Sequence, residues 1–180
     1  MSSLILLLFC SVTLYGQTKF QGSNLELTIT GTSTLHDWHM TTTSAEGIVV
    51  LTRENQSISI ENAEVEFLAE TLKSGKRGMD KNAYKALNTE DHPNITFSLD
   101  PITIEDGFKG ILKGDLTVSG VTRKLSLDAS VNIVNGQLKV SGKADFKLTD
   151  FQVEPPKALM GTIKTGNEVS IEFNTTIKTK

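Results

Sequence analysis

The 180-residue chain has a single cysteine, Cys10, which lies within its apolar first sixteen residues. This leader, MSSLILLLFCSVTLYG, indicates a secretory signal peptide over residues 1–16, with cleavage near Gly16 and Gln17. Its removal would leave no thiol, which excludes disulfides, cysteine nucleophiles and cysteine-ligated metal sites. We therefore expect a periplasmic or secreted protein that is held together by a hydrophobic core.

The chain also lacks an excess of charge of one sign and a long apolar run beyond the leader. Its formal net charge is −3, with acidic and basic residues interspersed and without a basic tract of the kind that binds nucleic acid. No apolar run after the leader reaches the roughly 20 residues of a membrane-spanning helix. The sequence thus predicts one domain over residues 17–180, with no nucleic-acid partner and no transmembrane segment.

Alternation of apolar and polar residues, in contrast, runs through most of the chain and is typical of strands with one buried face. In NLELTIT it places Leu25, Leu27 and Ile29 on one face. The same pattern recurs in SISIENAEVEF, NITFSL, KGDLTVSG, RKLSLDASVNIV, GQLKVSGKADFKL and NEVSIEFNTTIK. In the first of these the phase changes near Asn62, which predicts a β-bulge there.

Residues that favour tight turns separate these runs at 105–107, 119–121, 134–136 and 165–167, which indicates hairpin connections. About eight one-sided strands in mostly up-and-down order can close around an apolar interior. The sequence therefore predicts an all-β fold built as an antiparallel barrel. A sandwich of two sheets is the alternative closure.

One segment, GMDKNAYKALN, breaks the alternation and predicts a short helix near residues 80–88. Asp80 is a favoured N-cap residue, and Met79 before it could pack on Tyr84 as a hydrophobic staple. Asn88 is suited to the left-handed conformation that ends many helices. We expect this helix to be inserted between strands of the barrel.

The stretch HDWH, residues 36–39, concentrates groups that could do chemistry. In an extended strand, His36 and Trp38 point to one face while Asp37 and His39 point to the other. The two histidines then cannot share one metal ion, so we expect no metal site there. Asp37 and His39 are expected to face solvent. His36 and Trp38 are expected to face inward, either as a pocket wall or as ordinary core.

Five basic residues, Lys73, Lys76, Arg77, Lys81 and Lys85, surround the start of the predicted helix. Helix N-termini and arginine side chains favour anions. The spacing does not match the GxxxxGK[ST] loop that binds phosphates in many nucleotide-binding proteins. A solvated basic loop is therefore the simpler interpretation, and an anion site is the alternative.

Recognisable catalytic motifs are missing as well. No serine lies in a G-x-S-x-G motif, and the third histidine, His92, precedes a proline. An enzyme would have to use His36, Asp37 or His39, and no reaction can be named for them. The sequence favours a protein that is not an enzyme and that needs no cofactor.

The segment GDLTVSGVTRKLSLDASV, residues 114–131, resembles the G-x-LT-x-x-GVT-K/R-x-x-x-L segment of the YceI-like family. Residues 76–99 and 146–156 are similar to its central stretch and to a late strand, and His36 matches a histidine of its first hairpin. The resemblance implies an exported bacterial protein with a lipocalin-like barrel. It implies a ligand that is long and apolar, a polyisoprenoid or an isoprenoid-tailed quinone.

This resemblance leads to a set of expected ligand-binding residues. Large side chains of the strands and the first hairpin would line the barrel: His36, Trp38, Phe67, Phe97 and Phe146. Residues outside the strands would close its mouth: Tyr84, Leu87 and Met160. Arg77, with Lys73 or Lys76, would meet a polar or anionic head group. The alternative is a structural or partner-binding barrel with a filled core, and the chain could form a homodimer.

Overall fold

The computed structural model of the chain describes residues 16–20 and 25–178, so the predicted signal peptide lies outside the described residues up to residue 15. The described residues form α1 (Arg77–Leu87), three short 3₁₀ turns and twelve strands. The turns are η2 (Ala69–Thr71), η3 (Leu148–Phe151) and η4 (Leu159–Gly161). The strands are β1 (Gly16–Phe20), β2 (Leu25–Ser33), β3 (Trp38–Thr42), β4 (Glu46–Glu54), β5 (Ser57–Leu68), β6 (Asn94–Leu99), β7 (Ile102–Glu105), β8 (Phe108–Val118), β9 (Val121–Val134), β10 (Gln137–Lys147), β11 (Lys157–Ala158) and β12 (Ile163–Lys178). None of the described helices combines the length and the apolar character that crossing a bilayer would need.

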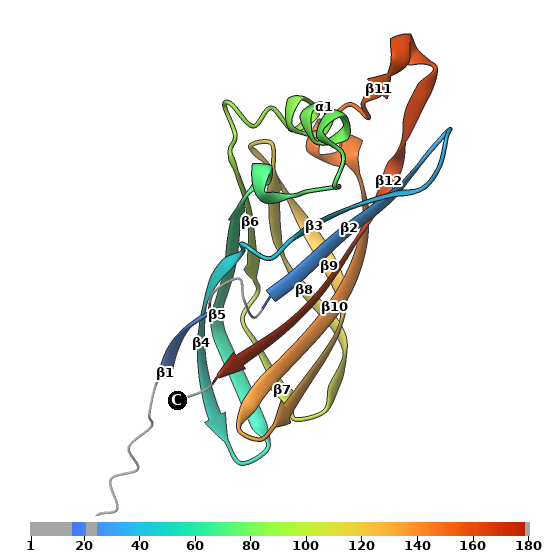
Figure 1. Cartoon of the computed structure of the whole chain (residues 1–180). Helices are drawn as coiled ribbons and strands as arrows, with labels where there is room; N and C mark the ends of the chain where they lie inside the picture. The colour runs from blue at the N-terminus through green and yellow to red at the C-terminus, as the bar shows by residue number, and fades with distance from the viewer. Residues whose placement is uncertain (1–15, 21–24, 179–180) are drawn as a thin grey trace, which may run out of the picture.

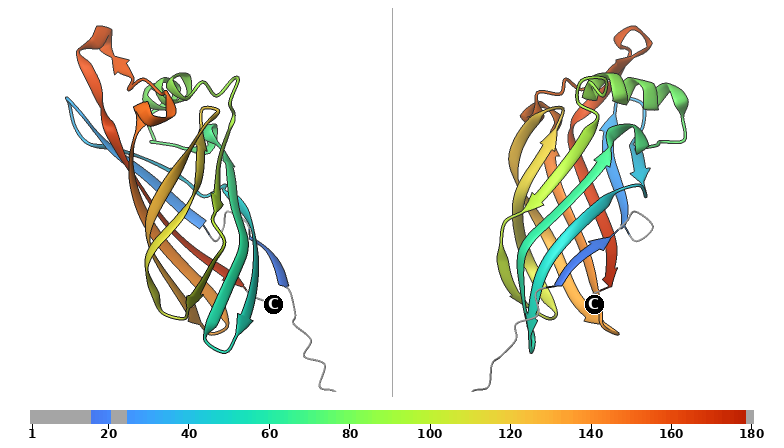
Figure 2. Two further views of the ribbon diagram at one scale, coloured as in Figure 1. Left: turned by 180° about the vertical axis from the view of Figure 1, so that it is seen from behind. Right: turned by 90° about the vertical axis from the view of Figure 1, so that its left-hand side faces the viewer.

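The strands pair antiparallel in the order β1-β4-β5-β6-β8-β9-β10-β12-β2-β3, with β7 beside β5 and β11 beside β12. The sheet curls into a half-barrel (Figure 1). Helix α1 lies across one end, and the β4–β5 and β9–β10 hairpins form the other (Figures 1 and 2). The prediction of an antiparallel, lipocalin-like all-β fold with one inserted helix is confirmed.

The sheet holds more strands than the eight expected, for two reasons. Strand β4 reads EGIVVLTRE, in which a continuous apolar run hides the alternation that marks a one-sided strand. Strand β1 reads GQTKF, which has a single large apolar residue, and strands β7 and β11 have only four and two residues, so no period is visible in these three. The missed strands extend the sheet without changing its architecture.

Alternation along each strand decides which side chains enter the interior. In β9, Leu125, Leu127, Ala129 and Val131 are buried, while the residues between them are exposed or half-buried. The same separation holds in β8, where buried residues alternate from Leu112 to Val118. One face of the sheet therefore supplies almost the whole hydrophobic core.

The bulge predicted near Asn62 is confirmed. Val50 of β4 pairs with Asn62 of β5, but the next residue, Leu51, pairs with Ile60. Glu61 is the extra residue in β5, and its side chain is exposed. The shift lets the apolar residues on both sides of Glu61 face the interior despite their change of phase.

The predicted hairpin turns at 119–121 and 134–136 are confirmed, because they join the paired strands β8–β9 and β9–β10. The stretch 105–107 also contains a turn, but the strands that it joins differ in their partners: β7 pairs with β5, and β8 pairs with β6 and β9. In the turn at 119–121, Ser119 and Gly120 both have positive φ angles (51° and 73°), as a tight two-residue hairpin requires. The prediction at 165–167 is wrong, because these residues lie inside β12. There the pairing register with β2 shifts between Thr165 and Val169, so the small residues form an irregularity within the strand.

Helix α1 begins at Arg77, three residues before the predicted start, and no side chain caps its N-terminus at Lys76. The carboxylate of Asp80 instead accepts hydrogen bonds from the backbone N–H and the hydroxyl of Ser74, at 2.9 and 2.6 Å. The prediction that Asp80 caps the helix is therefore wrong. The predicted hydrophobic staple is also wrong, because Met79 lies inside the first turn of α1 and not before it. The Asp80 carboxylate is thus hydrogen-bonded to Ser74 and not, as the local sequence pattern had predicted, to the backbone N–H groups at the start of the helix.

The C-terminal half of α1 is held to the barrel by hydrogen bonds. Asn88 ends the helix in the left-handed conformation (φ 51°, ψ 51°), as predicted. The Ser119 hydroxyl in the β8–β9 turn donates to the carbonyl of Leu87 at 2.7 Å. The Tyr84 hydroxyl donates to the carbonyl of Leu72 at 2.7 Å. These bonds fix the helix over the end of the half-barrel.

Candidate ligand-binding site

A cavity of about 810 Å³ occupies the interior of the half-barrel below α1. Its wall is built from the inward faces of strands on both sides of the barrel, with aliphatic side chains such as Leu127, Leu138 and Ile177. Met79 and Leu87 contribute to the wall from α1. The arrangement is a largely apolar site inside the half-barrel, of the kind that holds small-molecule ligands.

Six of the nine expected ligand-binding residues line this cavity: His36, Trp38, Phe67, Leu87, Phe97 and Phe146. Arg77, Tyr84 and Met160 are not part of the lining. Arg77 is exposed at the first residue of α1, and Met160 is fully exposed in η4. Tyr84 lies behind the wall, where its hydroxyl donates to the Leu72 carbonyl and accepts from the Lys73 amine at 2.7 Å.

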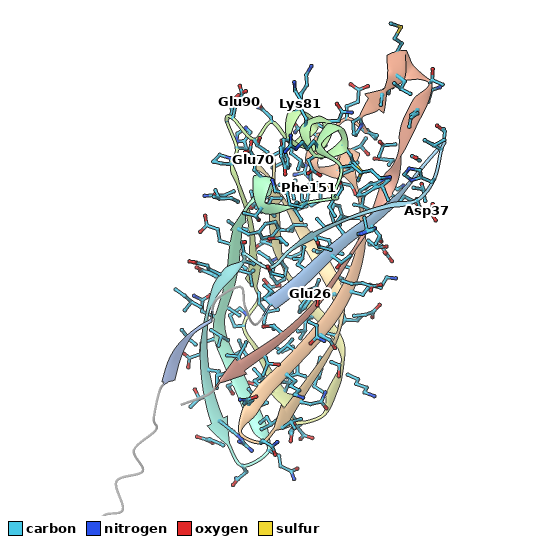
Figure 3. The ribbon with its side chains drawn as sticks, viewed as in Figure 1. Glu26, Asp37, Glu70, Lys81, Glu90 and Phe151 are labelled. Carbon is cyan, nitrogen blue, oxygen red and sulfur yellow. The ribbon has the colours of Figure 1, made fainter. Side chains whose placement is uncertain are left out.

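The strand interpretation of residues 36–39 is wrong in its first half, because β3 begins only at Trp38. His36 lies in the exposed turn between β2 and β3, and its Nδ1 lies 2.7 Å from the Asp37 carbonyl oxygen. A carbonyl can only accept, so Nδ1 carries the proton. His36 and Trp38 nevertheless both reach the cavity, one from the turn and the other from the strand. Asp37, in the connection between β2 and β3 just before Trp38 (Figure 3), and His39 are exposed, as expected.

Four aromatic rings lie directly against glycines of the sheet: Trp38 on Gly31, Phe97 on Gly114, Phe108 on Gly110 and Phe173 on Gly142. A Cβ atom added at Gly31 would lie 2.3 Å from the Trp38 ring. One added at Gly114 would lie 2.4 Å from both the Phe97 ring and a backbone carbonyl oxygen. The missing side chains let the rings lie close to the sheet, and the centre of the barrel stays open.

Sequence reasoning missed most of the contribution of α1. Its cavity-lining residues follow helical spacing: Met79, Asn82, Ala83, Ala86 and Leu87. This spacing is visible in the sequence, but of these five residues only Leu87 was among the expected ligand-binding residues. Lys81 and Lys157 also line the cavity and were not expected there.

Two charged groups beside α1, Lys73 and Asp80, have shifted pKa values. Partial burial opposes ionisation of Asp80, but the two hydrogen bonds from Ser74 and the nearby Lys73 outweigh it and lower the pKa of this carboxyl. The hydrogen bond with the Tyr84 hydroxyl raises the pKa of Lys73. Neither Lys73 nor Asp80 lines the cavity.

Within the described part of the chain, no group of three or more His, Cys, Asp or Glu side chains could hold a metal ion.

The geometry agrees with a comparison to known families. A model of the YceI-like domain matches residues 13–177. The chain belongs to the YceI-like family. No curated protein matches the chain closely enough to serve as a relative.

Solved structures show that this YceI-like chain shares its fold with proteins of low sequence identity. A polyisoprenoid-binding domain from Saccharophagus degradans, implicated in plant cell wall breakdown, has a TM-score of 0.66 at 10% identity and covers 93% of this chain and 100% of its own. Burkholderia cenocepacia BcnA has a TM-score of 0.64 at 13% identity, covering 84% and 95%. A Campylobacter jejuni YceI protein has a TM-score of 0.56 at 15% identity, covering 74% and 81%.

The structure explains the glycines of the segment that suggested this family. Gly114, its first residue, is buried where a Cβ atom would collide with Phe97. Gly120 has a φ of 73° in the β8–β9 turn and lies against the His92 ring. Between them, Leu116 points into the cavity. The segment therefore specifies a stretch of cavity wall and the tight turn that follows it.

Close packing of Trp38 on Gly31 generates a first prediction. Gly31→Ala should push the indole away from the sheet, destabilise the protein by about 1–3 kcal/mol and shift the emission of this single tryptophan. Fluorescence spectra and urea unfolding measure both effects. The matched control is Gly78→Ala, since a Cβ atom there meets open space in a helix that alanine favours. Equal stability of the two variants would contradict the proposed role of Gly31.

Two buried threonines give a second prediction. Thr175 lines the cavity, and its buried hydroxyl has no hydrogen-bond partner, whereas the Thr42 hydroxyl bonds to that of Thr71 at 2.8 Å and accepts from the N–H of Ser44. Thr175→Val should leave the free energy of unfolding unchanged or raise it by about 1 kcal/mol, while Thr42→Val should lower it by about 1–3 kcal/mol. Urea denaturation compares them, and the reverse order would show that the Thr175 hydroxyl is satisfied.

Proposed function

We propose that this YceI-like protein binds and carries a long apolar molecule, a polyisoprenoid or an isoprenoid-tailed quinone, inside the half-barrel. The observation that carries the proposal is the cavity of about 810 Å³ with its almost wholly apolar wall. A polyisoprenoid-binding domain with the same fold supports the choice of ligand class. The leader over residues 1–16 supports export, to the periplasm or beyond.

Burial of apolar surface would supply most of the affinity. Each buried CH₂ group contributes about 0.8 kcal/mol, so a ten-carbon tail would contribute about 8 kcal/mol before the cost of ordering it. Such a tail needs few directional contacts, which fits a wall made of leucine, isoleucine, valine and aromatic side chains. The same wall would accept tails of different chemical detail, provided that their cross-section fits.

The two alternative functions fit the site less well. A structural or partner-binding barrel would be expected to fill its core, but the interior here is open. An enzyme that used His36 would need a carboxylate or a nucleophile beside it in the cleft. No Asp or Glu of the described residues lines the cavity, and the His36 Nδ1 donates to a backbone carbonyl. We therefore propose a carrier that does not catalyse a reaction.

The direct test is to purify the full chain from a bacterial host and to analyse its organic extract by mass spectrometry. We expect an isoprenoid that co-purifies in stoichiometric amounts. Delipidated protein should then bind added isoprenoids, with a change in the fluorescence of Trp38 on the cavity wall. An extract without any apolar molecule, together with no binding of added isoprenoids, would reject the proposal.

Filling the cavity provides a third prediction. Ala63 of β5 lines the cavity, and the change Ala63→Phe would place a ring in the space meant for the ligand. We expect isoprenoid affinity to fall at least about tenfold without loss of stability, because the ring occupies an existing void. Ser126→Phe, on the exposed face of β9, adds the same bulk outside and should bind as the unmodified chain does. Unchanged affinity of Ala63→Phe would place the ligand elsewhere.

A further inference from the structure

The charged side chains of the cavity lining are all cationic. Lys76 and Lys81 reach it from the start of α1, and Lys157 from β11. Among the described residues, no aspartate or glutamate lines the cavity, although acidic residues outnumber Lys and Arg in the chain, 21 to 18. Lys81 lies at the end of the barrel that α1 covers (Figure 3). The cavity therefore combines a deep apolar wall with a positively charged end.

These lysines are available to a ligand. Among the described residues, the amines of Lys76 and Lys81 have no ion pair and no hydrogen bond, unlike Lys124, which contacts two aspartates. Lys157 contacts Glu154 at 3.3 Å, but both side chains are largely exposed (57% and 83%), so the contact is weak. An anion at the mouth would therefore have little competition from the protein's own carboxylates.

The N-terminus of α1 adds its partial positive charge to that of the lysines at this end of the cavity. This 11-residue helix has no side-chain cap, and the nearest acid, Asp80, accepts its hydrogen bonds from Ser74 instead. Gly78 in the first turn lines the cavity, and a Cβ atom on it would meet open space. Uncapped N–H groups and the helix dipole favour a negative charge at this position.

We propose that the ligand is an amphiphile with an anionic head group, a carboxylate or a phosphate, held at the mouth by Lys76, Lys81 and Lys157. Its apolar tail extends into the barrel toward Leu138 and Ile177. This assignment rests on the proposed function and narrows it from any apolar molecule to an acidic lipid. The lysines act as head-group selectors, while the apolar wall provides the bulk of the affinity.

Matched ligand pairs test the assignment on the delipidated full chain. Hexadecanoate is compared with hexadecanol, and farnesyl phosphate with farnesol, by titration calorimetry at pH 8 and low salt. We expect the anion of each pair to bind on the order of tenfold more tightly or better, as for hydrogen bonds to charged groups. The pair with the larger ratio identifies carboxylate or phosphate as the preferred head group.

Variants of the lysines complete the test. The double change Lys76→Gln with Lys81→Gln should abolish the preference for the anion while leaving the affinity for the alcohols unchanged. The control double change is Lys113→Gln with Lys139→Gln, two exposed lysines on β8 and β10 outside the cavity lining, and it should keep the preference.

The outcomes separate this inference from the proposed function. If anions and alcohols bind equally well and the Lys76 and Lys81 changes have no effect, the head-group assignment is overturned while the carrier function stands. If none of the four ligands binds, and none co-purifies, the carrier function itself fails. A preference that persists in the Lys76 and Lys81 variant but disappears in the control would also overturn the assignment.

Discussion

Burial of one face of a single continuous sheet is the constraint on which the rest of the structure depends. Each strand must place its apolar side chains on that face, and the sheet must curl until the face is enclosed. The enclosed volume exceeds what these side chains fill, so about 810 Å³ stays open. Glycines opposite Trp38, Phe97 and Phe173 keep the largest rings against the wall. Helix α1 then closes the end that the strands leave uncovered.

The local sequence pattern correctly predicted those features of the fold that depend on neighbouring residues alone. Alternation in β9, the bulge beside Asn62 and the turn at Ser119 and Gly120 all follow from side-chain direction and backbone preference. The start of α1 did not follow, because Asp80 had two possible partners and the fold brought Ser74 to it. Residues 165–167 had the chemistry of a turn, but pairing with β2 on one side and β10 on the other keeps β12 continuous.

The sequence predicted an apolar ligand-binding site, but it predicted less well which residues line that site. Large residues on strands, such as Phe67 and Phe97, were assigned to the interior from their alternation, and both line the cavity. Residues on connecting segments could not be placed in this way, since no period fixes their direction. Met160 points to solvent on such a segment, while Lys157, three residues earlier, lines the cavity. Sequence alone therefore described the apolar wall and the presence of Lys76 at the site, but it did not predict that Lys81 and Lys157 also line the cavity or that Arg77 does not.

The pairing of β2 with β12 has a consequence for the order of events during folding. Leu25 lies opposite Thr175, so residues 150 positions apart in the sequence must meet to complete the wall. Contacts of such high sequence separation form late and slow the folding of β-rich chains. Until β12 is in place, the apolar face remains open along one side, and no enclosed compartment exists. If the proposed function holds, the ligand can enter only after the C-terminal strand has been synthesised, and the partly folded chain exposes its apolar face until then.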